Sequence, residues 1–315
     1  MDELIQAVEG LSSSRDWSLM FELRDLAREA RSTGRQLWPI ATLCEYRLAL
    51  RAPAVWVGRV LADHTGQSPF GPLTEVAAQQ HTWLELCDVI PPGPDAAFIA
   101  YERMMRGDLD PILDERADPN VLELPFRLWD WEPRYMLAQY TDNGAEFPAP
   151  PTPAPDTEVA LPPPAESVGD PHTVEAFREL VTPWTAASNG RCDIVTVEGD
   201  HLSAIATLGV SRARVRQIEP EQAMALMGWA GASGGAHGRR RGAAYGRFAA
   251  WWAAASVAGL AEEWPISASE MGDVVRFLRW YVWDAYEPAT GWHLRLAVHD
   301  REEELGMAIA AVDHA

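Results

Sequence analysis

The chain has 315 residues, 47% of them apolar and 23% charged, which is the composition of a folded globular protein with room for two domains. All 26 basic residues are arginine, which excludes both a lysine Schiff base and the lysine of a P-loop. The formal net charge of −20 repels phosphate backbones and anionic lipid, so nucleic acid is not expected as a partner.

Helical periodicity dominates the first half of the chain. Apolar residues recur at steps of three and four, and prolines and glycines separate the periodic segments. The pattern predicts five helices, over residues 17–30, 37–50, 53–62, 73–86 and 95–105. Residues 121–146 are rich in aromatic side chains but show no clean period. We therefore expect an all-helical domain over residues 1–146.

A proline-rich segment follows this domain. Residues 147–164 contain eight prolines in 18 positions, a composition that favours extended polyproline II structure over helix or sheet interior. We interpret residues 147–168 as a semi-rigid linker. A recognition motif for a proline-binding module is the alternative.

The second half mixes helix and strand signals. We expect a helix over 173–187 with a break at Pro183, a β-hairpin over 194–208, and a strand at 214–218. Pro220 suits a first helical turn, and a further helix is expected over 239–260. Three more strands are expected at 275–285, 292–299 and 307–312. The prediction is an α+β protein whose C-terminal domain, residues 169–315, has a mainly antiparallel sheet packed with two or three helices.

A segment rich in glycine and arginine is the leading candidate site. Between residues 212 and 247 there are seven arginines and only two acids, and a glycine-dense turn leads into the start of a predicted helix. Free N–H groups at a helix start and close backbone approach at glycine both favour an anion. The site would use Gly234, Gly235, His237, Arg239, Arg240 and Arg241. Alternatively, the arginines pair with the protein's own acids and the glycines form a turn.

Two other motifs suggest different functions. Residues 231–235 match G-x-S-x-G, which would make Ser233 the nucleophile of a serine hydrolase if a strand preceded it. The segment LGVSRARVRQIE resembles the recognition helix of sigma-factor-like helix-turn-helix regulators, with residues 202–219 as the motif and Arg212, Arg214 and Arg216 facing DNA. Pro220 and a first helix that is one residue short favour the hairpin instead.

Location and partners complete the prediction. The acidic start Met-Asp-Glu lacks the basic region of a signal peptide, and the longest apolar run, residues 249–261, is shorter than the roughly 20 residues of a membrane span. The three cysteines, Cys44, Cys87 and Cys192, form no C-x-x-C motif. We expect a cytoplasmic protein with reduced thiols, no membrane segment, no metal and no cofactor.

The segments GASGGAHGRRRGAAYGRFAAWW and GWHLRLAVHD resemble uncharacterised proteins of high-GC actinobacteria. The resemblance covers the C-terminal half and implies no activity. We therefore predict a non-catalytic interaction or ligand-binding protein whose partner is another protein or a small anionic ligand, with DNA binding and serine hydrolysis as alternatives. The oligomeric state stays open.

Overall fold

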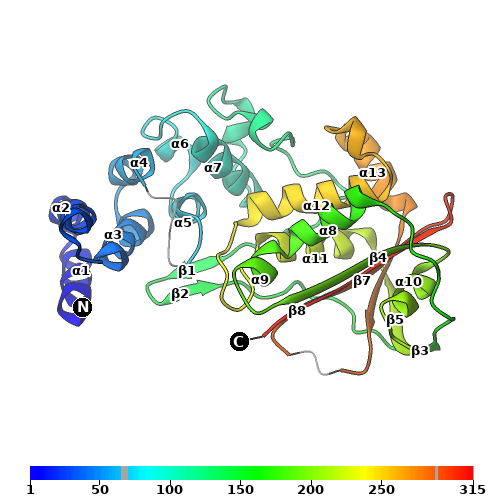
Figure 1. The fold of residues 1–315 in the computed structure, drawn as a ribbon. Helices are drawn as coiled ribbons and strands as arrows, with labels where there is room; N and C mark the ends of the chain where they lie inside the picture. Colours follow the sequence, from blue (N-terminus) through cyan, green and yellow to red (C-terminus); the bar gives the residue numbers. More distant parts are fainter. Residues whose placement is uncertain (65–69, 288–289, 315) are drawn as a thin grey trace. The chain divides into compact units, whose positions relative to one another are not determined.

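A computed structural model describes residues 1–64, 70–287 and 290–314, and the chain divides into two compact units (Figure 1). Unit 1 comprises Met1–Arg127 and Leu137–Phe147. Unit 2 comprises Leu128–Met136 and Pro148–Ala315. The sequence analysis assigned residues 128–136 to the N-terminal domain, whereas the structure groups them with the C-terminal half.

Unit 1 is mainly helical, as its periodicity predicts. Its central helix is α3, which contacts α1, α2, α4 and α5 and buries most of its side chains. The periodic stretch 73–86 contains two helices rather than one, and a β-ribbon of β1 and β2 occupies part of the aromatic stretch. The elements are α1 (Asp2–Ser14), α2 (Trp17–Glu29), η1 (Ala30–Thr33), α3 (Trp38–Arg51), α4 (Ala54–Ala62), α5 (Leu73–Gln80), α6 (Trp83–Leu86), α7 (Pro94–Met105), η2 (Asp110–Leu113), η3 (Pro119–Val121), β1 (Gln139–Thr141) and β2 (Gly144–Glu146).

Unit 2 contains a six-stranded sheet among its described residues, in the order β3-β5-β6-β7-β8-β4, with every neighbouring pair antiparallel. The predicted α+β class with a mainly antiparallel sheet is confirmed. The elements are β3 (Thr157–Ala160), α8 (Pro171–Leu180), α9 (Thr182–Ala186), β4 (Arg191–Glu198), α10 (His201–Thr207), β5 (Arg212–Ile218), α11 (Pro220–Ala232), α12 (Ala243–Val257), η4 (Ala261–Glu263), α13 (Ala268–Phe277), β6 (Arg279–Asp284), β7 (Trp292–Asp300) and β8 (Leu305–Asp313).

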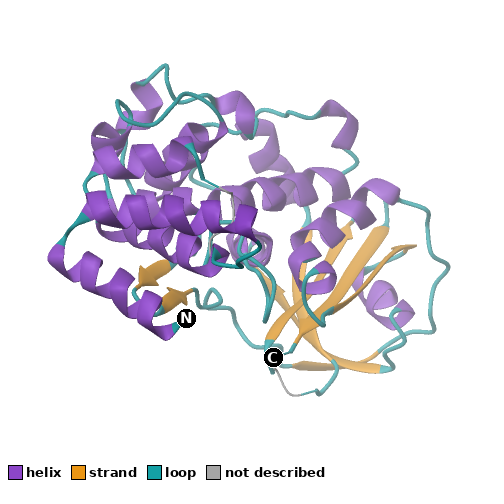
Figure 2. Cartoon of the chain, turned by 60° about the vertical axis from the view of Figure 1, so that its left-hand side comes forward, coloured by secondary structure: helices purple, strands orange, loops and turns teal. Residues whose placement is uncertain are grey.

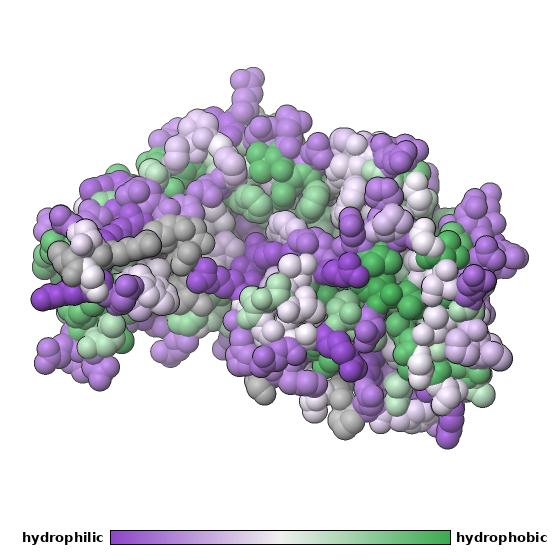
Figure 3. All heavy atoms as spheres, in the orientation of Figure 1, coloured by the Kyte–Doolittle hydropathy of each residue, from purple (hydrophilic) through white to green (hydrophobic). Residues whose placement is uncertain are grey.

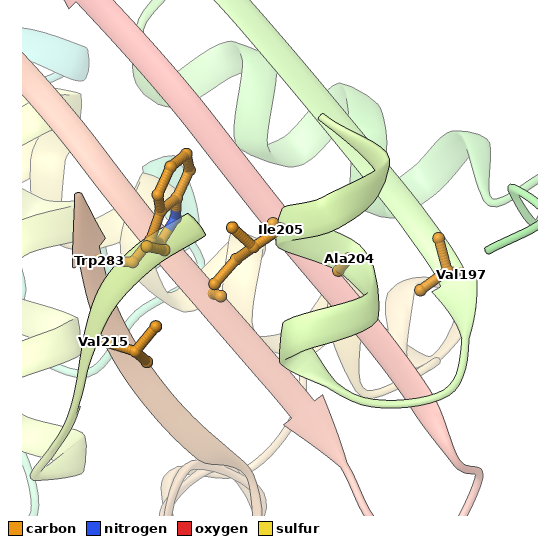
Figure 4. Close-up of a cluster of buried hydrophobic side chains, with 8 residues drawn as sticks. Val197, Ala204, Ile205, Val215 and Trp283 are labelled. Carbon is orange, nitrogen blue, oxygen red and sulfur yellow. The ribbon is translucent and has the colours of Figure 1, made fainter. Parts of the chain in front are cut away.

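Helices cover both faces of this sheet (Figure 2). Side chains alternate between the faces along β7, so Trp292 and Ala297 lie on opposite sides. Trp292 stacks on Trp229 of α11 at 5.1 Å between ring centroids, which places α11 on the first face. Ala297 belongs to a buried cluster with Ile205 of α10, which places α10 on the second face (Figure 4). Helix α12 packs on α8 and α11.

The predicted β-hairpin over residues 194–208 is wrong. Its first half is β4, but residues 201–207 form helix α10, which begins at Asp200, whose side chain accepts a hydrogen bond from the Ser203 N–H at 2.9 Å. Strands β4 and β5 are not neighbours in the sheet order. The chain must therefore cross the sheet between them, and α10 makes that crossing over one face.

Part of the proline-rich segment belongs to the sheet. Residues 157–160 form edge strand β3, which pairs with β5 from Thr157↔Val215 to Ala160↔Arg212. Prolines flank β3 on both sides, at Pro155 and Pro162. Proline cannot donate a ladder hydrogen bond, so an edge is where a proline-flanked strand is tolerated. This stretch is thus a structural part of unit 2.

The segment Leu128–Met136 is held in unit 2 by buried polar and aromatic contacts. The Trp131 indole donates a hydrogen bond to the Ala268 carbonyl at 3.0 Å, and its ring lies 4.9 Å from the ring of Trp251. Glu132 forms an ion pair with Arg247 in which both side chains have 0% exposure. These contacts place residues from the middle of the chain in the core of the C-terminal unit.

Hydrophilic side chains predominate on the face of the molecule that Figure 3 shows, with apolar side chains in smaller patches. Among the described residues, no helix is long and apolar enough to cross a membrane.

Candidate ligand-binding site

The glycine-rich turn between α11 and α12 receives a carboxylate from its own chain. Asp313, which is fully buried at the end of β8, accepts a hydrogen bond from the Ala236 N–H at 2.6 Å and from the Ser188 hydroxyl at 2.8 Å. Gly235 has a φ of 67°, and a Cβ there would lie 2.2 Å from Asp313 Oδ2. One backbone N–H of the glycine-rich turn, that of Ala236, therefore already binds a carboxylate of the chain itself.

The arginines of the same segment also make contacts within the chain. Arg241 forms an ion pair with Glu179 at 2.6 Å and donates hydrogen bonds to the backbone carbonyls of Glu179 and Gly231. Arg239 and Arg240 have internal interactions as well. Gly234 is buried and His237 is exposed. The structure brings the predicted residues into one turn, and the anion site there stays a prediction.

Ser233 has a structural environment. It is 0% exposed, accepts a hydrogen bond from the Trp184 indole at 2.7 Å and donates one to the Ala230 carbonyl at 3.1 Å. It ends helix α11, so a helix precedes it where a nucleophile elbow requires a strand. The hydrolase interpretation therefore fails at this serine.

The helix-turn-helix interpretation of residues 202–219 is also wrong. Helix α10 ends before Gly209, and the expected recognition helix is strand β5. Arg212, Arg214 and Arg216 alternate along that strand, which puts all three on one face. They pair there with Glu158, Asp284 and Asp156, respectively.

The sheet of unit 2 splits between β6 and β7. Their ladder runs from Arg279↔His299 only to Val282↔Leu296, although both strands continue. Beyond that point, β6 pairs with β5 alone and β7 pairs with β8 alone among the described residues. Figure 1 shows β6 turning away from β7 where β7 and β8 stay side by side.

A cavity of about 480 Å³ lies at this split. Four of its wall residues are apolar and buried, namely Leu226, Val282, Trp283 and Leu294. The proline-rich segment supplies another wall. The remaining lining residues are Thr152, Pro153, Ala154, Pro155, Arg214, Asp284, Glu287, Thr290, His293, Arg295 and Val312.

Two ion pairs lie in the cavity wall. Arg214 forms a two-point contact with Asp284, with Nε–Oδ1 and Nη2–Oδ2 distances of 3.0 Å. Arg295 Nη2 pairs with Glu287 Oε2, and its guanidinium carbon lies 5.6 Å from the centroid of the Trp283 ring. The cavity thus combines an apolar floor with balanced charges, an arrangement typical of sites for small organic molecules.

Comparison with known proteins places the whole chain in one family. The model of a family of unknown function (DUF6183) matches residues 2–314. The chain belongs to the DUF6183 family. This match extends through both halves of the chain, beyond the C-terminal segments that carried the resemblance to uncharacterised proteins. No curated protein and no solved structure matches it.

For this DUF6183 member, chemistry at the site must therefore be argued from its own residues. Among the described residues, no group of three or more His, Cys, Asp or Glu side chains could hold a metal ion. No motif in the sequence predicts the cavity. The only signal was Arg295 within the alternating strand WHLRLAVH, where a charged residue on one face is compatible with plain solvent exposure.

Proposed function

We propose that unit 2 is a non-catalytic ligand-binding domain that holds a small, partly apolar molecule in the split-sheet cavity. The observation that supports this proposal is the indole of Trp283. Trp283 lines the cavity and is 3% exposed, and its Nε1–H has no hydrogen-bond partner among the described residues.

A buried indole N–H without a protein partner among the described residues favours the binding of a molecule that can accept its hydrogen bond. Leaving a buried donor without a partner costs about 1–3 kcal/mol, which a ligand oxygen could recover by accepting the hydrogen bond. The cavity volume of about 480 Å³ falls in the range of about 300–1,000 Å³ that small-molecule sites occupy. Burial of the ligand against Leu226, Val282 and Leu294 would add the apolar contribution.

We further propose that the protein works in the cytoplasm of a high-GC actinobacterium. All three cysteines are free, and Cys44 and Cys87 are buried. Burial raises the pKa of the Cys44 thiol to about 12, so this thiol stays protonated and unreactive at neutral pH. Free, inert thiols suit a reducing compartment, and the absence of lysine in the sequence supports the proposed source.

The test uses 3-phenylpropanamide, an uncharged probe with a phenyl body and a carbonyl acceptor. At about 0.3 kcal/mol per heavy atom, a ligand of this size binds with a dissociation constant in the millimolar range. Saturation-transfer NMR on the full chain at 5 mM probe, a concentration of that order, is expected to detect binding. Leu226→Trp fills the cavity and should abolish the signal, whereas Leu84→Trp, at an exposed site in unit 1, should leave it unchanged.

Circular dichroism checks that each variant is folded, and Leu294→Phe replaces Leu226→Trp if that variant does not fold. Loss of binding in a folded cavity-filling variant supports the proposal. Equal signals in the wild type and the filled variant, or no signal in the wild type, would overturn it.

A further inference from the structure

We infer that the ligand of the split-sheet cavity is an apolar carboxylic acid, whose carboxylate takes the place of Glu287 on Arg295. This inference rests on the proposed function and adds the chemical class of the ligand. Three features support this class of ligand: the present partner of Arg295, a second hollow that Arg295 also lines, and the apolar walls of the main cavity.

The ion pair between Arg295 and Glu287 is asymmetric. The Arg295 side chain is 16% exposed, whereas that of Glu287 is 64% exposed and lies outside the strands. A solvated carboxylate loses little when it leaves a guanidinium, because water replaces the contact. The Arg295 side chain is mostly buried, so its charge needs an anion in return. Glu287 thus occupies the position in which an incoming carboxylate would bind.

A second hollow adjoins the first at Arg295. Its volume is about 260 Å³, and it shares Glu287, Thr290, Arg295 and Val312 with the main cavity. It adds Arg191 and His314 to the lining. Arg191 has an acidic neighbour, Asp193, at 3.3 Å. Arg191 and Arg295 each have an acidic partner, so this end of the site becomes net positive only when Glu287 leaves Arg295.

The geometry of the groups favours a carboxylate over a phosphate. One guanidinium can donate two parallel hydrogen bonds to the two oxygens of a carboxylate. The other arginine of the main cavity, Arg214, is already held by two bonds to Asp284. A phosphate dianion in the main cavity would therefore be bound by one guanidinium, that of Arg295, rather than by several. The apolar body of the acid would lie against Leu226 and Leu294, within reach of the Trp283 ring.

The test compares two probes of nearly equal shape, 3-phenylpropanoate and 3-phenylpropanamide, on the full chain by NMR titration. The carboxylate is expected to bind the wild type at least ten times more tightly than the amide. Arg295→Gln should remove this preference, so that the carboxylate and the amide bind with similar dissociation constants. Glu287→Gln should strengthen carboxylate binding several-fold, because it removes the competing anion. Arg276→Gln, at an exposed arginine elsewhere in unit 2, is the matched control.

The outcomes separate this inference from the proposed function. If neither probe binds, the proposed function fails and this inference fails with it. If both probes bind equally, or if Arg295→Gln leaves the preference intact, the cavity binds ligands but the carboxylate assignment is wrong. The assignment is supported if the preference for the carboxylate over the amide is lost in Arg295→Gln and increased in Glu287→Gln. If Arg295→Gln does not fold, Glu287→Gln alone tests the assignment.

Discussion

The ion pair between Glu132 and Arg247 offers the sharpest test of how unit 2 is stabilised. Both side chains have 0% exposure. The carboxylate accepts hydrogen bonds from Arg247 Nε at 2.7 Å and Nη2 at 2.8 Å, and also from the Tyr135 hydroxyl at 3.1 Å and the Trp251 indole at 2.9 Å. The perturbation is Glu132→Gln, which keeps the shape of the side chain and removes its charge.

The expected loss of stability is large. Glutamine takes away the negative charge that faces the buried guanidinium, and its amide nitrogen replaces one acceptor with a donor. Removing one partner of a buried ion pair costs about 3–5 kcal/mol. For a domain of this size, each kcal/mol lowers Tm by about 2–4 °C, so a decrease of roughly 10 °C is expected.

The assay is equilibrium urea unfolding of the full chain, followed by far-UV circular dichroism, with a thermal scan of the same samples. Asp130→Asn is the control, because Asp130 lies in the same segment but is 85% exposed in its pair with Arg276. It should leave the midpoint unchanged. If Glu132→Gln unfolds at the wild-type midpoint, the buried pair makes no net contribution to the stability of unit 2.

Three other predictions concern pH, packing and anions. Burial lowers the pKa of His201 from 6.5 to about 4. Between these two pH values the unfolded chain binds more protons than the folded chain, so the free energy of unfolding should fall as the pH decreases. His201→Phe should therefore reduce the difference in urea midpoint between pH 7.5 and pH 5. Gly246→Ala puts a methyl group 2.2 Å from a carbonyl of α11 and should destabilise by about 1–3 kcal/mol. Gly10→Ala, in open space on α1, should instead stabilise by about 0.5–1 kcal/mol, and denaturant titration compares the two. Phosphate should raise the Tm of the wild type and not of Arg239→Ala/Arg240→Ala if the glycine–arginine turn binds anions; equal Tm shifts would exclude the site.

The site shows where local patterns fail. The alternation of apolar residues in WHLRLAVH identifies β7, and it is typical of a strand with one solvent-facing side, here the side that carries Arg295 and Ala297. In the structure Ala297 is 0% exposed beneath α10, and Arg295 lines the cavity. Neither fact follows from alternation, because a strand's own pattern does not show which helix crosses its face or where its neighbour diverges.

The sequence by itself determined the elements whose signals are local. The apolar periodicity of α2 and α3, the proline that begins α11 and the period of two in β5 and β7 are properties of neighbouring residues, so they can be read without the fold. Tertiary structure decided the rest. The short helix α10, the entry of residues 128–136 into unit 2 and the early end of the β6–β7 ladder all depend on contacts between residues far apart in the chain. Packing and the pairing of buried charges determine these contacts, and neither produces a periodic pattern in the sequence.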